Sequence, residues 1–380
     1  MASSVCFDLN EKNRWEGKVE ESEAMKMTEC IGTFYEIGLQ YGEAGRANLQ
    51  KTLGMCLGNL AGFAKISRNV ELSREEIVAT AGKFLSMAEA FDPELIEFVK
   101  GVAEGSGMSF QEAFYLRCAY DMLLCYGQMS SMCTSFAATG SATRNGKTII
   151  GRNIDFSGDW PFELLKIRHA DGLEQLALCV GGVEWDVLNS NGFCNTMNGV
   201  FNSDYRRNLP YGCYMFKAMR QRSIGAALRV LCRSARGSLY HVLASAEGDI
   251  VGFESTSDEF EILQPDNDIL THSNHYQTTA FKQVDGAYTT FQDFPDTFLR
   301  TMRIRRLMER HYGDITPEVM MNILSDHNNS PNSICRHPDS SAPPGLMGET
   351  LASVIMVPEE RKMFIAYGNP CRCEYVEYVL

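Results

Sequence analysis

The spacing of apolar residues changes near residue 130, from a helical period to the alternation of strands and hairpins, and this change limits the folds open to the chain. Before residue 130, several apolar runs begin at helix-start signals. Thr33, Ser73 and Ser109 are each followed three residues later by Glu, the spacing of a capping box. Asp92-Pro93 places proline in the first turn of a further helix. The first third of the chain is therefore predicted to be mostly helical.

After residue 130 the pattern favours β-hairpins. Asn145-Gly146 is a strong two-residue turn signal, and Asp171-Gly172 sits between two apolar runs. Later elements are predicted as strands near 239–245, 250–255 and 260–263, helices at about 211–235 and from Asp296 and Thr316, and a closing hairpin of Leu351–Val357 with Met363–Tyr367. The proline- and glycine-rich stretch from Ser330 to Gly345 is predicted to be a surface loop.

Strands gathered in one block and helices in others predict a layered α+β protein, in which helices cover antiparallel sheets. With 380 residues, of which 44% are hydrophobic, the chain is long enough to bury a sizeable core.

The charge balance excludes some partners. A net charge of -13 weighs against nucleic acid, because phosphate binding favours a basic surface. The arginines in 300–310 are predicted to form a solvated helix face. No apolar run is long enough to span a bilayer, and Met1 to Glu16 lack a secretory pattern, so no membrane partner and a cytoplasmic location are predicted.

The thirteen cysteines are odd in number and spread from Cys6 to Cys373, which predicts reduced thiols. They form no Cys-x-x-Cys pair, and the closest two are Cys371 and Cys373. Because zinc sites usually show paired ligands at short, repeated spacings, no metal site is predicted. Nor is a cofactor, since the chain has no nucleotide-binding loop.

The stretch most informative for chemistry runs from Cys133 to Phe156. A hairpin folds Cys133, at the start of one strand, back beside Arg152 and Asp155 at the end of the next. Local sequence alone thus brings together a nucleophile, a cation and a carboxylate. By spacing alone, an ordinary core thiol at Cys133 and a surface ion pair of Arg152 and Asp155 are the favoured explanation of these residues.

This hairpin resembles the nucleophile strand of choloylglycine hydrolases and penicillin V acylases, and of the related isopenicillin N acyltransferase family, in which Cys-Thr-Ser or Cys-Thr-Thr is followed by Gly-Arg/Gln-Asn-x-Asp. Four further segments resemble the acyltransferase branch in the same order along the chain. They are Gly32–Gly38 with Gly42, Asn189–Phe193 with Asn198, Thr271–Tyr276, and Thr350–Val357 with Gly368 and Pro370. The resemblance covers nearly the whole chain.

The resemblance implies a four-layer αββα sandwich, the fold of N-terminal-nucleophile hydrolases, and a self-cleavage between Met132 and Cys133. Residues 1–132 would become a mostly helical α chain and residues 133–380 the β chain that carries the hydrolase core, giving a possible α/β heterodimer. The substrate would be a small acyl-amide or acyl-thioester, and its identity, like the choice between hydrolysis and transfer, is not readable from the sequence. Aromatic residues near 156–162 and 201–214 are predicted to wall the acyl pocket, with an ordinary core cluster as the alternative: Phe156, Trp160, Phe162, Phe201, Tyr205 and Tyr211.

The resemblance also implies the roles of single residues. Cys133 would be the nucleophile and its own freed α-amine, with an ordinary pKa of about 7.7–8.0, the general base. Arg152 would lower the pKa of the thiol, and Asp155 would orient the amine or the thiol. Asn274 would donate to the oxyanion, with Asn198 as a second candidate donor. Thr134 would belong with Asn198 to the oxyanion or substrate-binding group, where it is expected to support the strand and not to react. Asn198 also fits a turn residue in left-handed conformation.

Two alternatives remain open in the sequence. Cys133 could act without cleavage, activated by His272 or His275, or the chain could be an inactive binding protein of the same fold. A three-residue spacing at a strand end predicts that these two histidines face opposite sides, which disfavours a shared metal. Met132 stands where self-cleaving relatives usually have glycine, so slower cleavage is expected.

Overall fold

Two β-sheets form the centre of the protein in a computed structural model that describes residues 24–124, 131–200, 202, 208–233, 239–286, 295–341 and 348–380. One sheet has eight strands in the order β1-β4-β5-β6-β7-β8-β9-β10, and the other has six in the order β11-β2-β3-β12-β13-β14. The strands are β1 (Met27–Gly32), β2 (Ser131–Gly140), β3 (Gly146–Phe156), β4 (Phe162–His169), β5 (Glu174–Val180), β6 (Val183–Asn189), β7 (Phe193–Gly199), β8 (Leu239–Ser245), β9 (Ile250–Ser255), β10 (Phe260–Leu263), β11 (Ile269–His272), β12 (Glu349–Val357), β13 (Lys362–Tyr367) and β14 (Val376–Val379).

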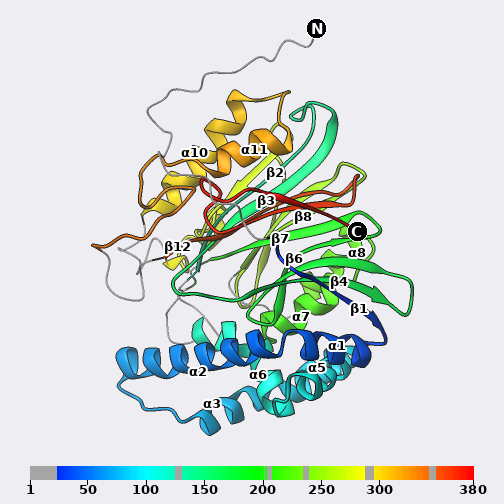
Figure 1. The fold of residues 1–380 in the computed structure, drawn as a ribbon. Coiled ribbons are helices and arrows are strands. Elements are labelled where there is room, and N and C mark those ends of the chain that lie inside the picture. The colour runs from blue at the N-terminus through cyan, green and yellow to red at the C-terminus, as the bar shows by residue number, and fades with distance from the viewer. Residues whose placement is uncertain are drawn as a thin grey trace.

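Helices cover the outer face of each sheet, so the layers run helix, sheet, sheet, helix (Figure 1). The helices are α1 (Phe34–Ala44), α2 (Arg46–Arg68), α3 (Arg74–Ala81), α4 (Leu85–Phe91), α5 (Pro93–Ser106), α6 (Phe110–Leu124), α7 (Tyr211–Ala218), α8 (Ile224–Arg233), α10 (Asp296–Arg310) and α11 (Pro317–Leu324), with 3-10 turns at η2 (Gly82–Phe84) and η3 (Thr279–Phe281). Helices α1, α7 and α8 contact the eight-stranded sheet, whereas α10 and α11 contact the six-stranded sheet. The predicted αββα sandwich is confirmed.

Short-range signals in the sequence fix several helix starts. Thr33 and Ser73 each complete a capping box, with the side chain accepting from the backbone N–H three residues on and the Glu there bonding back. Pro93 is the first residue of α5. Strands β2 and β3 pair as the predicted antiparallel hairpin, but residues 141–145 connect them, so the two-residue turn predicted at Asn145-Gly146 is wrong. Gly146, with φ of 74°, is the first residue of β3.

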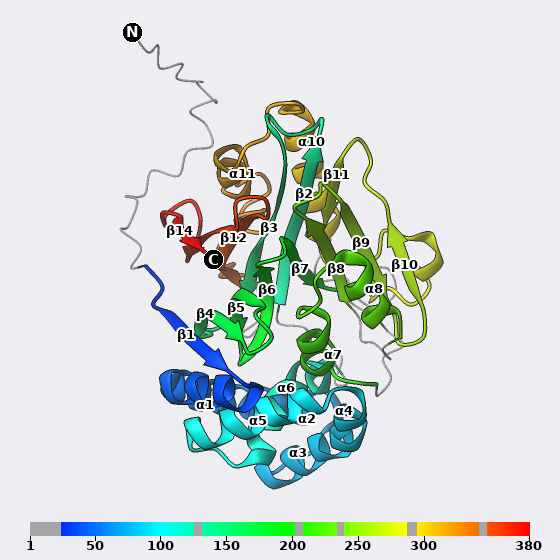
Figure 2. The same cartoon turned by 90° about the vertical axis from the view of Figure 1, so that its right-hand side faces the viewer.

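The N-terminal segment also contributes a strand, which its helical pattern did not reveal. Strand β1 pairs with β4 in parallel, from Met27 opposite Leu164 to Gly32 opposite His169. Figure 2 shows β1 at the edge of the eight-stranded sheet, above the layer of α1 to α6. The segment before residue 125 therefore contributes one strand to the eight-stranded sheet, whose other strands all come from later in the chain.

Helices α1 and α5 pack closely through glycines. A Cβ on Gly38 would lie 2.1 Å from the carbonyl oxygen of Phe98, and one on Gly101 would lie 2.1 Å from that of Tyr35. Because contacts this short do not occur for a real Cβ, both positions require glycine at this separation. Gly38 in α1 and Gly101 in α5 thus allow the two helices to pack this closely.

The surface loop predicted from Ser330 is only partly at the surface. Ile334 and Cys335 are fully buried, while Asp339 to Ser341 are exposed or nearly so. Asn153 of β3 holds this inward turn, because its side-chain amide donates to the carbonyl oxygens of Leu324 and Ile334 at 2.8 and 2.9 Å. Proline and glycine content indicated the loop but not the buried asparagine that draws it inward.

Candidate active site

Cys133 lies near the start of β2 and is fully buried between the two sheets. It is paired with Ile154 of β3, and Arg152 is paired with Ser135 two residues further along. Because alternate residues of a strand share a face, the register places the side chains of Cys133 and Arg152 on one face. Accordingly, Arg152 Nη1 lies 3.5 Å from Cys133 Sγ.

Arg152 is held by the opposite sheet. Its Nε and Nη2 donate to the two carboxylate oxygens of Asp186 at 2.9 and 2.7 Å, and Nη1 also donates to the carbonyl oxygen of Met197. The guanidinium lies 5.3 Å from the ring centroid of Trp185. Arg152 and Asp186 are both fully buried, so the cation beside the thiol is fixed in place. Asp186 was not among the residues found by sequence.

Burial sets the net acidity of the thiol. It raises the pKa of Cys133 to about 11, and the neighbouring Arg152 acts in the opposite direction without cancelling it. Arg152 by itself lowers the pKa of the thiol, which is the direction predicted from the sequence, but burial has the larger effect. In the continuous chain the thiol is therefore protonated at neutral pH.

Asn274 lies beside Cys133, as predicted, but with its carbonyl group toward it. Its Oδ1 accepts from the backbone N–H of Cys133 at 3.0 Å and from Arg300 at 2.9 Å, while its Nδ2 donates to the carbonyl oxygen of Gly199 at 2.8 Å. Two donors facing one side-chain atom determine the orientation of the amide. In this arrangement Asn274 Oδ1 positions the nitrogen of Cys133, and one of the two Nδ2 hydrogens is taken by Gly199.

Arg300 is a site residue that the sequence prediction missed. The arginine-rich stretch of α10 was expected to be solvated, yet Arg300 is 1% exposed. Its Nη1 donates to the carbonyl oxygen of Cys133 at 2.6 Å and to Thr134 Oγ1 at 2.8 Å, and its Nε pairs with Asp296 at 2.8 Å. The i,i+4 spacing of Asp296 and Arg300 on one helix was the signal available in the sequence.

Asp155 lies on the other face of the hairpin from the thiol. It is paired with Met132 in the strand register, so it stands across from the residue that precedes Cys133. Thr350 Oγ1 donates to its Oδ1 at 2.7 Å, and Arg336 Nε lies 3.9 Å from its Oδ2. Arg336 also pairs with Asp296 at 2.5 Å. This placement favours a role toward the backbone at Cys133 over a role toward its sulfur.

Asp155 should make stability depend on pH. Burial raises the pKa of its carboxyl from 3.8 to about 6, against the lowering effects of Arg336, Arg300 and Thr350. Because the folded-state pKa is the higher one, its stabilising contribution is fully present below pH 3.8 and is lost as pH rises through 6, a difference of about 3 kcal/mol. Urea unfolding of Cys133→Ala should show this change relative to Cys133→Ala/Asp155→Asn. A difference between the two variants that stays constant with pH would contradict the prediction.

Asn198 is part of β7 and not a turn residue. Its Nδ2 donates to Ser135 Oγ at 2.9 Å and to the carbonyl oxygen of Ser273 at 3.0 Å. Both amide hydrogens thus connect the two sheets next to the cysteine strand. Thr134, as expected, supports the strand by accepting from Arg300.

His272 and His275 do not lie on opposite sides, and that prediction is wrong. Their rings stack with centroids 6.2 Å apart, because His275 lies beyond the end of β11 where strand alternation no longer applies. His272 bonds Glu254 at 2.9 Å, and His275 bonds Thr297 at 2.9 Å. Burial lowers the pKa of His275 to about 3. Among the hydrogen bonds of the described residues, neither histidine reaches Cys133.

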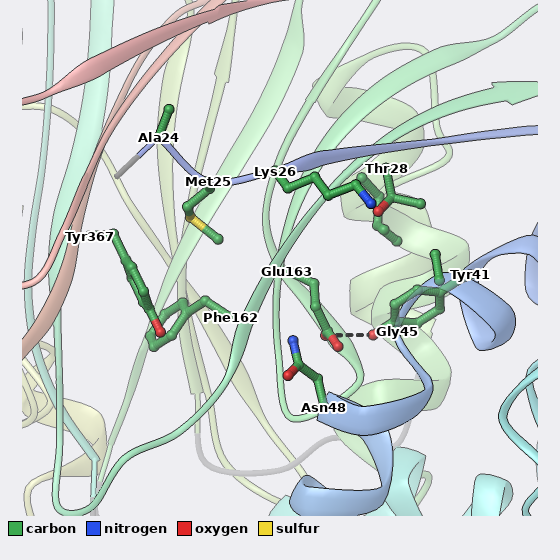
Figure 3. Close-up of a pocket in the computed structure, with 12 residues that line it drawn as sticks. Ala24, Met25, Lys26, Thr28, Tyr41, Gly45, Asn48, Phe162, Glu163 and Tyr367 are labelled. Atoms are coloured by element: carbon green, nitrogen blue, oxygen red, sulfur yellow. Dashed lines mark hydrogen bonds between the residues drawn. The ribbon is translucent and has the colours of Figure 1, made fainter. Parts of the chain in front are cut away.

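A separate cavity of about 380 Å³ lies where β1 meets β4 and the α1–α2 turn (Figure 3). Tyr41 donates to Glu163 at 2.8 Å in its wall, and Phe162 packs against Tyr367 with ring centroids 5.6 Å apart. Cys133 is not among its lining residues. Phe162 was predicted to line the acyl pocket, and the structure places it here.

The other predicted pocket aromatics pack together near Arg152. The Phe156 ring lies 5.6 Å from Trp160 and 5.3 Å from Trp185, and Tyr211 lies 6.3 Å from Trp185. Two further predicted wall residues, at 201 and 205, lie outside the described residues. The cluster borders the cation that touches the thiol.

Within the described part of the chain, the helices offer no segment with the length and apolarity to cross a bilayer. The spacing of cysteines in the sequence predicted no metal site. In the structure, however, four side chains that could bind a metal lie close together: His327, Cys335, His337 and Cys371.

Two facing sheets with a helical layer on each outer face are the architecture of N-terminal-nucleophile hydrolases. Residues 141–372 match the family described as acyl-coenzyme A:6-aminopenicillanic acid acyl-transferase. The chain belongs to this family of acyl-transferring enzymes. The match begins at residue 141, just after β2. It does not include Cys133 or Thr134, so the roles considered for these two residues depend on the geometry of the site.

Solved structures similar to the chain have two activities in their names. A mutant of conjugated bile acid hydrolase from Clostridium perfringens has 13% identity and a TM-score of 0.45, with 65% of this chain and 97% of that chain covered. Penicillin V acylase from Agrobacterium tumefaciens has 14% identity and a TM-score of 0.42, with 62% of this chain and 83% of that chain covered.

Proposed function

We propose that the protein is a self-processing cysteine amidohydrolase or acyltransferase, which acts through an acyl-Cys133 intermediate after cleavage of the Met132–Cys133 bond. One observation carries this proposal. The two atoms of Cys133 that the chemistry needs have separate buried partners, since its nitrogen bonds Asn274 Oδ1 and its sulfur contacts Arg152. An ordinary core cysteine also needs an acceptor for its backbone N–H, but it has no need of a buried cation against its sulfur.

In the processing step, Cys133 Sγ attacks the carbonyl carbon of Met132. The thiol loses its proton, the C–S bond forms, and the C–N bond breaks as the nitrogen is protonated to an amine. Water then hydrolyses the thioester, which leaves a carboxylate on Met132 and regenerates the thiol. Asp155, across the ladder from Met132, is the carboxylate suited to move the proton. The Met132 side chain slows this step relative to glycine because it restricts the backbone.

After cleavage the nitrogen of Cys133 becomes the general base. Asn274 Oδ1 accepts one of its N–H groups, which directs the lone pair toward the sulfur. Arg300 holds the carbonyl group of the same residue, and Arg152 stabilises the thiolate. Asn198 joins the cysteine strand to β7 and keeps the two sheets in register around this nucleophile.

The substrate class follows from the family and the cluster beside Arg152. The acyl donor is a small-molecule amide or a thioester such as an acyl-coenzyme A, and the acyl-cysteine is resolved by water or by an amine. A bound thioester is then a substrate and not a resident cofactor. The described cysteines are free thiols, which fits a reducing compartment such as the cytoplasm. Pairing of β1 with β4 supports an α/β heterodimer after cleavage.

The uncleaved Cys–His alternative has less support, since His272 and His275 are engaged by Glu254 and Thr297. Retention of the buried contacts at Cys133 likewise weighs against a purely binding role.

Intact-mass measurement of the denatured wild-type protein tests the proposal. We expect two chains, residues 1–132 and 133–380, and N-terminal sequencing of the larger one should begin at Cys133. Selective blocking of its α-amine should then abolish turnover while leaving the thiol present. An active preparation that consists of one continuous polypeptide would refute the mechanism.

A further inference from the structure

Four metal-ligating side chains converge between the loop after α11 and the segment after β13. They are His327, Cys335, His337 and Cys371, and their ligand atoms all lie within 4.8 Å of one another. His327 Nε2 is 3.1 Å from His337 Nε2, which is 3.7 Å from Cys335 Sγ and 3.5 Å from Cys371 Sγ. Along the chain His337 is 10 residues from His327, 2 from Cys335 and 34 from Cys371, so the group does not have the short, repeated spacing by which zinc ligands are recognised in a sequence.

Three of the six distances between ligand atoms lie close to the edges of a zinc coordination tetrahedron, two of them within its range and one slightly shorter. Zinc binds sulfur at about 2.3 Å and imidazole nitrogen at about 2.0–2.1 Å, so tetrahedral ligand atoms lie roughly 3.3–3.8 Å apart. The three distances given above range from 3.1 to 3.7 Å. A dication bound by two thiolates and two neutral imidazoles is electrically neutral, which suits a site in which Cys335 is fully buried.

The backbone holds the two segments in place around this point. The amide of Cys335 donates to Asp326 O at 3.1 Å, and the Asn369 side chain donates to the carbonyl oxygen of Arg336 at 2.8 Å. The second bond ties the residue between two ligands to the turn that carries Cys371. These hydrogen bonds therefore hold the segments that carry Cys335, His337 and Cys371 next to one another.

We propose that His327, Cys335, His337 and Cys371 bind a structural zinc ion that fastens the C-terminal segment to the loop after α11. Four protein ligands fill a tetrahedral site, which leaves no position for substrate.

The ion would also support the candidate active site through Arg336, which stands between Cys335 and His337 in sequence. Arg336 pairs with Asp296 at 2.5 Å and lies 3.9 Å from Asp155, and its backbone N–H donates to Thr350 Oγ1 at 2.9 Å. Zinc thereby fixes a positioning residue for Asp155. The site itself does not depend on the proposed function, since it requires no cleavage at Cys133.

Metal analysis of the full chain, purified under reducing conditions without a histidine tag, tests the site. We expect about one zinc per chain, and Co²⁺ alone, added to chelated protein, should give the intense visible absorption and thiolate-to-cobalt bands of a tetrahedral site. Cys371→Ser and His327→Gln should weaken Zn²⁺ binding by at least about 10²-fold in a chelator competition. Chelation should lower the melting temperature of the wild type.

Cys373→Ser is the matched control, because Cys373 lies two residues from Cys371, has similar exposure and is outside the group. It should bind zinc as tightly as the wild type and respond equally to chelation. Wild-type protein that takes up neither Zn²⁺ nor Co²⁺, or equal zinc binding by Cys371→Ser and Cys373→Ser, would overturn the assignment. Neither of these outcomes alters the mass pattern that tests cleavage.

Discussion

Replacing Cys133 by alanine should leave one uncut polypeptide of 380 residues and remove acyl transfer by a factor on the order of 10⁶. In the proposed mechanism the same sulfur forms the covalent bond in processing and in turnover, so both are lost together. Denaturing electrophoresis with intact mass gives the first readout, and acyl-enzyme formation with a thioester or amide substrate gives the second.

Cys194→Ala is the control for this change. Cys194 lies on β7, is fully buried and is also a free thiol, yet it has no bond to the residues around Cys133 among those described. It should be processed at the wild-type rate, apart from a modest loss of stability. Cleavage or undiminished turnover in Cys133→Ala would show that another residue performs the chemistry.

Replacing Arg152 by methionine should damage both folding and reactivity. The change leaves Asp186 fully buried without its cation, which is expected to cost about 3–5 kcal/mol of unfolding free energy. It also removes the positive charge 3.5 Å from Cys133 Sγ. Urea unfolding of this variant in the uncleavable Cys133→Ala background measures the first effect.

The double variant Arg152→Met/Asp186→Asn separates the two effects. Removing both charges should restore most of the stability, because no unpaired ion remains buried. The rate of cleavage should stay at least about 10-fold below that of the wild type, since a thiol pKa one unit higher corresponds to that factor. Asp186 partly offsets Arg152 at the thiol, so the net effect is smaller than the full charge would give. Recovery to within twofold would make Arg152 purely structural.

Local signals in the sequence predicted those parts of the protein that local chemistry decides. Capping residues at Thr33 and Ser73 marked helix starts, and the turn signal near residue 145 indicated the hairpin that brings Cys133 beside Arg152, although its loop is longer than predicted. These features need only residues close in sequence, so spacing was sufficient.

Contacts between distant segments decided the rest. Arg300 resembled its solvated neighbours on α10 until the helix was packed on the cysteine strand. The direction of the Asn274 amide depends on Arg300, which donates to its oxygen, and so could not be inferred from the motif. The four converging ligands come from a loop and a turn that meet only after β12 and β13 pair.

Because β1 pairs with β4, refolding requires the segment before Cys133 to return to the eight-stranded sheet. The intact precursor delivers β1 and the helices behind it to the sheet as an intramolecular event. After the proposed cleavage, two severed chains must instead meet in solution, which makes their reassembly second order and dependent on protein concentration. Mature protein is then protected mainly by the slowness of its unfolding, because the tether that first guided folding has gone.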